Sequence, residues 1–395
     1  MNKTFTNPKL FLLFIVFGSS FACSQIQKTI ESQPGTQQEV QTTPSEAESP
    51  QSLPKDFSWS QLGSVEEIFD SVNSLAVAPE GTLYALGDVK GSVRLENGNF
   101  AKTFAKWNGF LWSEVGIGVG DAKKFVIAKD GTIYASIHVR NDESTGDVYE
   151  KITKWDGNRW SDLGDVDGFI SCMLLDSNGV LYAAGMFQAI GGIEATNVAK
   201  WDGNNWSAVG AWGYQDDSVS QMAIAPNGFL YVIHDEYYPS NLRQWDGVAW
   251  TPIQLGADLY VTFGSVVINP NGVLFTSGIK GEKFIPFIGK LDETVWSFID
   301  NEFNYIYQAD ESDNTGYVST ELIGFSTNGT LYIKNLTQLD SYSVFSWDGT
   351  QWLNQFELTI NDPNIFSPAE NSFYTVRYLE ESNNYEVYML RLKNP

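Results

Sequence analysis

The stretch Lys200-Trp201-Asp202-Gly203-Asn204-Asn205-Trp206 decides the fold, because the chain returns to it again and again. An Asp-Gly pair between apolar residues is a strong short-range hairpin signal, since glycine accepts the positive φ that a tight turn needs. If the middle residues form the turn, the two tryptophans face each other across adjacent strands. We therefore predict a hairpin with one cross-strand aromatic pair at each copy of this heptapeptide.

Further copies of the heptapeptide lie along the whole chain. Copies with both tryptophans occupy residues 106–112, 154–160, 244–250 and 346–352, and a decayed copy, Lys-Leu-Asp-Glu-Thr-Val-Trp, occupies 290–296. Side chains repeated in every unit usually serve packing between units. We therefore interpret the tryptophan pairs as contacts between repeats and not as platforms for sugar stacking.

A second motif, of the form Gly-x-Leu-Tyr, alternates with the first. Its seven occurrences lie at residues 80–84, 130–134, 178–182, 227–231, 271–275, 328–332 and 370–374. Most steps between them are in the forties of residues, which is the length of a four-stranded propeller blade. The two motifs therefore describe one repeating unit, with the second motif on one strand and the two arms of the tryptophan hairpin on the next two.

The first strand of each unit precedes the Gly-x-Leu-Tyr motif. Apolar residues recur six and four positions before its glycine, as period two requires of a strand with one buried face. The members of these two columns are Leu75, Phe125, Met173, Met222, Val266 and Ile323, and Val77, Ile127, Leu175, Ile224, Ile268 and Phe325.

The two ends of the repetitive region complement each other. Residues 57–63 match a fourth strand that lacks a third strand before it, and residues 385–392 match a third strand that lacks a fourth after it. Pairing of the two would close the ring and remove exposed sheet edges. We predict an all-β, seven-bladed β-propeller of four-stranded antiparallel blades over residues 56–395, closed by the N-terminal strand in the last blade.

The repeats resemble kelch-like and NHL-like propeller repeats of exported bacterial proteins. The third unit is the fullest: it has Tyr-Ala-Ala-Gly-Met-Phe at 182–187, paired glycines at 191–192 and Asn-Val-Ala-Lys-Trp at 197–201. The Gly-x-Leu-Tyr half is similar to the second strand of NHL blades. This resemblance implies the propeller fold and leaves the function open, because propellers carry many unrelated activities.

The N-terminus has the composition of a processing segment. Two lysines precede an apolar core at residues 10–22, and Cys23 follows a small residue, a pattern that resembles the bacterial lipoprotein signal. We predict a signal peptide over 1–22, a lipid on Cys23, and anchoring of the exported chain to the outer membrane or the cell surface. An ordinary secretory signal cut nearby is the alternative.

Residues 23–55 consist largely of Gln, Ser, Thr, Pro and Glu. A segment of this kind buries too little apolar surface to offset its ordering entropy, so we predict a disordered tether. Such a coil would hold the propeller about 30 Å from the anchor. With Cys23 acylated, Cys172 would have no disulfide partner, and we expect a free, unreactive thiol there.

The formal net charge of −24 argues against nucleic-acid partners, which need clustered Lys and Arg, and against docking of the folded domain on an anionic membrane. We therefore expect membrane contact through the lipid alone, no nucleic acid and a monomer. His138 and His234 are the two histidines, and both are expected just after the second strand of non-adjacent units, which does not favour a shared metal.

Positions that break the repeat are the candidates for a ligand site. The loops that enter each first strand and those that follow each second strand share one face of a propeller, and that face usually carries function. Its candidate ligand-binding residues are Asp165, Asp167, Trp212, Tyr214, Asp216, Asp217, His234, Tyr237 and Tyr238, with a further long insertion at 300–316. Aromatic rings beside carboxylates suit a carbohydrate, a cationic ligand or a protein partner.

Three functions remain open at this stage. The first is a surface-anchored binding scaffold for a protein or carbohydrate partner. The second is a propeller hydrolase or lyase that uses loop carboxylates, with calcium held by Asp165 and Asp167 as the one cofactor considered. The third is a structural envelope component without a small ligand. No known catalytic motif stands out in the chain, so no residue is predicted as catalytic.

Overall fold

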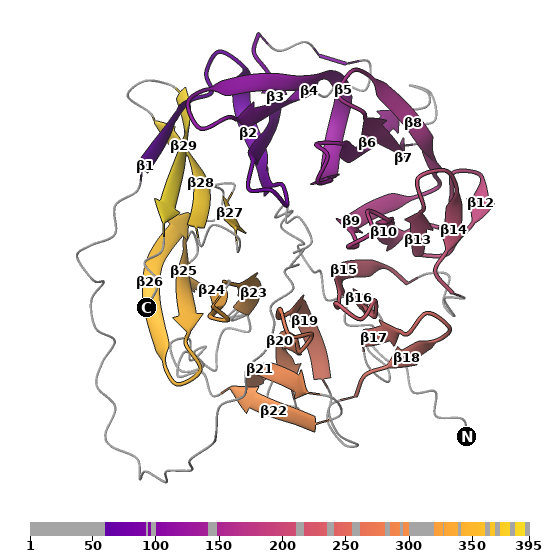
Figure 1. Cartoon of the computed structure of the whole chain (residues 1–395), viewed down its shortest axis with the longest axis vertical. Coiled ribbons are helices and arrows are strands. Elements are labelled where there is room, and N and C mark those ends of the chain that lie inside the picture. Colours follow the sequence, from indigo (N-terminus) through magenta and orange to yellow (C-terminus); the bar gives the residue numbers. More distant parts are fainter. Residues whose placement is uncertain are drawn as a thin grey trace, which may run out of the picture.

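The computed structural model describes residues 60–91, 94–95, 100–140, 148–210, 217–234, 241–254, 261–280, 285–292, 295–299, 320–326, 328–338, 341–359, 364–367, 372–379 and 384–391. Over these residues the chain is all-β, and Figure 1 shows its sheets arranged radially around a common centre. Among them, no helix is long and apolar enough to span a membrane. The predicted signal peptide, Cys23 and the predicted tether lie outside the described residues.

The sheets are β-propeller blades of antiparallel strands. Five sheets have four strands each, in the orders β1-β29-β28-β27, β14-β13-β10-β9, β15 to β18, β19 to β22 and β23 to β26. A sixth, nine-stranded sheet runs from β2 to β8 and ends with β11 and β12. The four-stranded antiparallel blade predicted from the two motifs is therefore confirmed.

The strands have the following bounds. In the nine-stranded sheet they are β2 (Phe69–Val77), β3 (Leu83–Val89), β4 (Lys102–Trp107), β5 (Trp112–Ile127), β6 (Ile133–Arg140), β7 (Val148–Trp155), β8 (Trp160–Val166), β11 (Ala189–Ile190) and β12 (Ile193–Glu194). The next two sheets contain β9 (Phe169–Leu175), β10 (Leu181–Met186), β13 (Val198–Trp201) and β14 (Trp206–Ala208), and β15 (Val219–Ile224), β16 (Leu230–His234), β17 (Leu242–Trp245) and β18 (Trp250–Pro252).

The remaining strands complete the ring. They are β19 (Val261–Ile268), β20 (Leu274–Lys280), β21 (Ile285–Asp292) and β22 (Val295–Ile299), then β23 (Thr320–Phe325), β24 (Leu331–Gln338), β25 (Ser341–Trp347) and β26 (Trp352–Thr359). The last sheet holds β27 (Asn364–Ser367), β28 (Ser372–Leu379), β29 (Asn384–Arg391) and, from the other end of the chain, β1 (Ser60–Ser64).

The tryptophan heptapeptides form the predicted hairpins. Trp201 pairs directly with Trp206, and their ring centroids are 5.6 Å apart. Asp202 closes this turn, because its Oδ1 accepts the backbone N–H groups of Asn204 and Asn205, each at 2.8 Å. The same tryptophan pairing occurs in the other four complete copies, with centroids 5.2 to 5.6 Å apart.

The second tryptophan of the hairpin also ties neighbouring blades together. The Nε1 of Trp206 donates a hydrogen bond to the carbonyl of Leu163 in the preceding blade at 2.8 Å. Equivalent bonds run from Trp160 to Gly116, from Trp250 to Val209 and from Trp296 to Gln254, at 2.7 to 2.9 Å. These bonds confirm that the tryptophans pack blade against blade.

Most members of the two apolar columns of the first strands lie in the core, whereas Val77, Ile224 and Ile323 are half-buried. Leu75, Phe125 and Met173 are each buried. In β23 the pattern shifts by one residue, so Leu322 is buried while Ile323 is half-buried. A register irregularity between Leu322 and Gly324 in the pairing of β23 with β24 accounts for the shift.

The ring closes as the sequence predicts. The N-terminal strand β1 pairs antiparallel with β29, the third strand of the last blade, and Ser60 lies opposite Met389. Leu62 of β1 packs with Val387 of β29 and with Trp112 of the first blade in one core cluster. The first and last described strands of the propeller therefore lie side by side in the closing blade, as Figure 1 shows.

Candidate functional site

The structure describes four of the nine predicted ligand-binding residues: Asp165, Asp167, Asp217 and His234. Trp212, Tyr214, Asp216, Tyr237, Tyr238 and the 300–316 insertion lie outside the described residues. The four described residues belong to one end of the ring, where the first strands begin and the second strands end. We call this end the loop face. The opposite end carries the tryptophan hairpin turns, and we call it the turn face.

Asp167 holds an inserted hairpin in place. Its Oδ1 accepts the backbone N–H groups of Gln188 and Ala189, both at 2.7 Å. These residues begin the β11–β12 hairpin, in which Ile190 pairs with Val166 of β8 across the blade boundary. The sequence places paired glycines here, but it does not show that the hairpin adds strands to the neighbouring blade.

Asp165 lies on the same edge, with its side chain exposed. Its carbonyl accepts the backbone N–H of Gly191 at 2.8 Å, so its main chain also helps hold the hairpin. Within the described residues, no group of three or more His, Cys, Asp or Glu side chains is placed to hold a metal ion. Calcium binding through Asp165 and Asp167 therefore stays a prediction.

His234 and Asp217 form a buried pair. With Arg243, these residues make up what we call the His234 cluster. The Nδ1 of His234 lies 2.8 Å from Oδ2 of Asp217, and both side chains are almost fully buried. The Nε of Arg243 donates a hydrogen bond to the Nε2 of His234 at 3.1 Å. Burial with paired charges indicates a packing role for both residues.

The two histidines lie inside their strands and not after them, which corrects the sequence prediction. His138 lies within β6, and His234 is the last residue of β16. The Gly-x-Leu-Tyr motif marks only the beginning of each second strand, so it does not show that the strand continues as far as the histidine. A strand can continue when partner side chains on both neighbouring strands satisfy the polar group.

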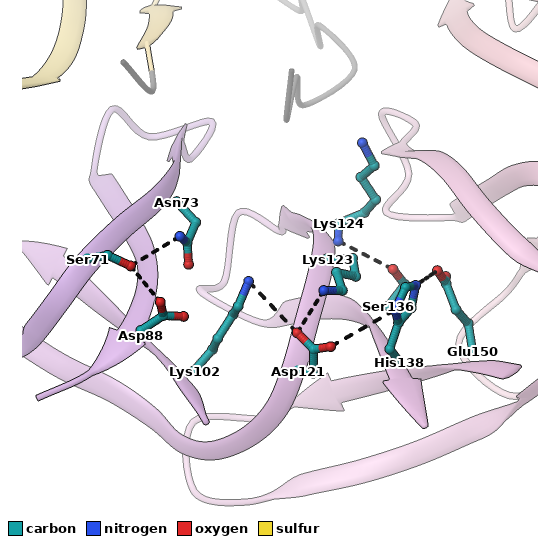
Figure 2. Close-up of polar contacts among 10 residues, drawn as sticks. All are labelled: Ser71, Asn73, Asp88, Lys102, Asp121, Lys123, Lys124, Ser136, His138 and Glu150. Atoms are coloured by element: carbon teal, nitrogen blue, oxygen red, sulfur yellow. Dashed lines mark hydrogen bonds and ion pairs between the residues drawn. The ribbon is translucent and has the colours of Figure 1, made fainter. Parts of the chain in front are cut away.

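His138 belongs to a second polar cluster on the loop face, shown in Figure 2. The Nε2 of His138 lies 2.7 Å from Oε1 of Glu150, and its Nδ1 lies 4.0 Å from Oδ2 of Asp121. The Nζ of Lys123 is 2.9 Å from Oδ1 of Asp121, and the Nζ of Lys102 is 3.9 Å from the same oxygen. We call these five residues the His138 cluster.

The His138 cluster spans two successive repeats of the nine-stranded sheet. Lys102 comes from β4, Asp121 and Lys123 from β5, His138 from β6 and Glu150 from β7. The second carboxylate oxygen of Glu150 accepts the backbone N–H of Ile170 in the next blade at 3.0 Å. Burial, and secondarily Lys123, lowers the pKa of Lys102, while Asp121 and Asp88 oppose that shift. The sequence could not group these residues, because five positions on four strands meet only in the folded ring.

Phe169 and Met186 lie beside the His138 cluster. They are opposite each other in the pairing of β9 with β10, and they are 42% and 45% exposed. The ring of Phe169 contacts that of His138, with centroids 6.1 Å apart. An exposed aromatic ring and a thioether next to a titratable imidazole make this the chemically richest part of the described loop face.

The blade formed by β23 to β26 carries a different polar pair on the loop face. Lys334 of β24 lies 3.0 Å from Glu321 of β23 and is nearly fully buried. Desolvation by burial lowers the pKa of Lys334, and the nearby Glu321 partly restores it. The loop face therefore has different polar side chains from blade to blade, on a scaffold whose strands repeat.

The turn face has its own shallow polar pocket. It has a volume of about 270 Å³ between the first two units, and its lining includes Glu80, Lys106, Asn108, Lys129 and Asp130. Next to Asn108 the turn ends in Phe110 and Leu111, which are 91% and 56% exposed.

No family model matches the chain, and no curated protein matches it. Solved structures do match this chain. One of two prolyl endopeptidases studied for inter-domain dynamics in catalysis and specificity aligns at 12% identity with a TM-score of 0.52, over 82% of this chain and 47% of that chain.

Two further solved structures align less closely. The propeller domain of the Trilobed protease from Pyrococcus furiosus aligns at 11% identity and a TM-score of 0.48, over 82% of this chain and 97% of that one. PorZ, a surface component of the type-IX secretion system of Porphyromonas gingivalis, aligns at 14% identity with a TM-score of 0.46. The alignment covers 82% of this chain and 47% of that one. This chain is thus a β-propeller protein, and identities this low show the fold alone.

Proposed function

We propose that the protein is an exported lipoprotein, held at the cell envelope by Cys23, whose seven-bladed propeller binds a protein or carbohydrate partner through the loop face. Kelch-like repeat composition and the lipoprotein-like N-terminus support this assignment. The folded ring then serves as a rigid scaffold, and the residues that vary from blade to blade supply recognition.

The blade count rests on the nine-stranded sheet. It contains two successive repeats, because the 16-residue strand β5 is the fourth strand of one and the first strand of the next. Gly116, Gly118 and Gly120 all have positive φ in the middle of β5, where the chain changes direction between the two repeats. Counting this sheet as two blades, beside the five four-stranded sheets, supports the proposed number of seven.

The observation that carries the binding role is the contrast between scaffold and loop face. Trp160, Trp206, Trp250 and Trp296 make the same bond to the preceding blade. Recognition residues on rigid elements lose little entropy on binding, which favours a scaffold of this kind. Over that uniform frame, the His138 cluster, the exposed Phe169–Met186 pair and the His234 cluster each occur in one place.

The test compares loop-face and turn-face variants of the processed chain. A glycan array and chemical cross-linking in the cell envelope would identify a partner, which is then purified and titrated. Trp212→Ala with Tyr214→Ala, and separately Phe169→Ala with Met186→Ala, should weaken binding at least tenfold in one pair or both. Asp217 is left unchanged, because it is buried against His234 and its loss would disturb folding.

The matched control is Val248→Ala on the turn face, where Val248 is 84% exposed. This variant should bind the partner as tightly as the parent chain. Equal affinity of both loop-face variants and the control would overturn the assignment of the loop face. Separately, Cys23→Ser should abolish lipid attachment, as measured by the mass of the processed chain, and should release the protein from the membrane fraction.

A further inference from the structure

The most exposed large apolar side chain among the described residues, Phe110, sits on a tight turn beside a second exposed apolar side chain, Leu111. Phe110 is 91% exposed and Leu111 is 56% exposed at the tip of the first tryptophan hairpin, between β4 and β5. At the same two positions the third unit has Asn204 and Asn205. A tight turn therefore does not need apolar residues there. Val248 is exposed alone at the first of these positions in the fourth unit, whereas the first turn exposes two adjacent large apolar side chains, which favours contact with a partner.

The same turn has lost its charge. Asp occupies the third position of the heptapeptide in five copies, at residues 156, 202, 246, 292 and 348, whereas the first copy has Asn108. The Oδ1 of Asn108 still accepts the N–H groups of Phe110 and Leu111, at 2.9 and 3.0 Å. The turn keeps its geometry without a carboxylate, whose transfer out of water would be costly.

The position of the turn relative to the N-terminus is the third observation. Strand β1 begins at Ser60, opposite Met389 near the end of β29. Third strands end and fourth strands begin at this end of the ring, so β1 starts on the turn face. Its Gly63 packs against Trp107 at the base of the 108–111 turn. Residues before Ser60, which include the predicted lipid site, therefore join the ring in the blade adjacent to this turn.

We propose that the Phe110–Leu111 turn inserts into the interfacial region of the bilayer that carries the lipid anchor. This inference rests on the proposed function, and it replaces the expectation that the lipid alone contacts the membrane. The attraction is hydrophobic, and it acts against the repulsion between the acidic chain and anionic headgroups. The pocket beside Asn108 is lined by Lys106 and Lys129 and also by Glu80 and Asp130, so polar side chains of both signs stand where lipid headgroups would lie.

Because of the predicted tether, even a weak contact between the turn and the bilayer is sufficient to hold the turn at the membrane. From Cys23 to residue 59 the chain has 37 residues, which as a flexible coil span about 30 Å. A lipid anchored through such a segment keeps the turn at high effective concentration near the surface, so binding becomes intramolecular. The other hairpin turns, which retain their aspartates, would stay in water, and the ring would tilt with its first blade toward the lipid.

The experiment measures the depth of the turn in the membrane. The full processed chain with Leu111→Cys, labelled with an environment-sensitive fluorophore, is placed in vesicles of phosphatidylethanolamine and phosphatidylglycerol that contain nitroxide lipids. Cys172 is buried and should not react. The label at position 111 should be quenched several-fold more strongly than a label at Asn205→Cys, the matching position in the third unit. Equal quenching at the two positions would overturn the proposal.

A second measurement tests the turn if the mass of the processed chain shows that no lipid is attached. That result would refute the proposed anchoring without refuting the turn. Co-sedimentation with the same vesicles then compares the parent chain with Phe110→Asn/Leu111→Asn, which copies the native turn of the third unit, and with Val248→Asn. The first variant should bind about tenfold more weakly, and the second should match the parent. Equal binding of all three, or a dimer lost only in the first variant by light scattering, would contradict membrane insertion.

Discussion

At the scale of the residue, the indole nitrogen of the second tryptophan joins the blade to the preceding blade in four of the hairpins. The Nε1 of Trp206 reaches the carbonyl of Leu163 in the preceding blade, and three other tryptophans make the same bond. Trp112 is different, because its Nε1 is buried and has no hydrogen-bond partner among the described residues. The blade that precedes Trp112 is the closing blade, which contains β1.

This difference predicts unequal effects of the same substitution. Trp206→Phe removes a hydrogen bond and leaves the Leu163 carbonyl without its donor, whereas Trp112→Phe removes a nitrogen that has no partner. Both side chains are 7% exposed, so the loss of apolar burial is similar. Trp206→Phe should lower the free energy of unfolding by about 1–2 kcal/mol more than Trp112→Phe. Urea denaturation measures the difference, and equal losses would contradict the role of the indole bond.

The turn aspartates predict a dependence of stability on pH. Hydrogen bonds from the Thr350 side chain, then from the backbone N–H groups of Gln351 and Thr350, lower the pKa of Asp348 to about 2. A carboxylate with a lowered pKa in the folded state stabilises that state above its unfolded pKa of about 4, and the contribution disappears as pH falls toward 2. Because the side chain is exposed, the effect should stay below about 1 kcal/mol.

Asp348→Asn keeps the acceptor oxygen, as Asn108 does in the first turn, and loses the titration. The parent chain should be more stable than this variant at pH 6, and the two should converge as pH falls from 4 to 2. Denaturation curves at pH 6, 4, 3 and 2 provide the measurement. A difference in unfolding free energy that stays constant over this range would show that the turn bonds do not depend on ionisation.

At the scale of the element, the β11–β12 hairpin is where the repeat is modified. It adds two short strands to the neighbouring blade through Ile190 and Val166, and Asp167 holds its first two N–H groups. Gly191 packs so closely on the Trp206 indole that a Cβ there would collide with it, while Gly192 has open space around it. The paired glycines therefore have different roles.

Substitution by alanine should separate the two roles. Both glycines have positive φ, 59° at Gly191 and 81° at Gly192, so both variants carry the cost of that backbone conformation, about 1 kcal/mol. Gly191→Ala should cost at least about 1 kcal/mol more, because the Trp206 indole must move out of its packed position. Thermal unfolding of the two variants measures this difference. If Gly192→Ala proved as destabilising as Gly191→Ala, close packing on Trp206 would not be the cause.

At the scale of the whole molecule, stability depends on a pairing between the two ends of the chain. Strand β1 completes the last blade and packs with the first blade through Leu62 and Trp112. Every other blade consists of strands close in sequence, so the closing blade alone requires a contact across more than 320 residues. Bringing together such distant segments carries the largest loop-closure entropy of the fold.

A disulfide across this seam should therefore stabilise the ring. Gln61 and Tyr388 lie opposite each other in β1 and β29, so Gln61→Cys with Tyr388→Cys places both thiols on the same face of the sheet. The oxidised variant should unfold at a higher temperature than its reduced form. Its free energy of unfolding should be higher by up to about 4 kcal/mol. Gln61→Cys with Met389→Cys is the control, because adjacent residues point to opposite faces. Efficient cross-linking of the control would contradict the register.

The repeating part of the fold could be predicted from the sequence. The pairing of Trp201 with Trp206, the strand that each Gly-x-Leu-Tyr motif forms and the closure by β1 all follow from local patterns of two to seven residues. A propeller repeats those patterns in every blade, so each copy confirms the others. The contacts of the candidate site residues could not be predicted in the same way, because Asp167 bonds the backbone of Gln188 and Asp217 pairs with His234 only in the folded chain.

By itself, the sequence determined the kind of blade, the hairpin turns and the way in which the ring closes. Only the tertiary structure decided which polar residues meet, such as His138 with Glu150, and which apolar residues stay in solvent, such as Phe110. The physical reason is that strand and turn formation depends on neighbours in sequence, whereas burial and charge pairing depend on neighbours from other blades.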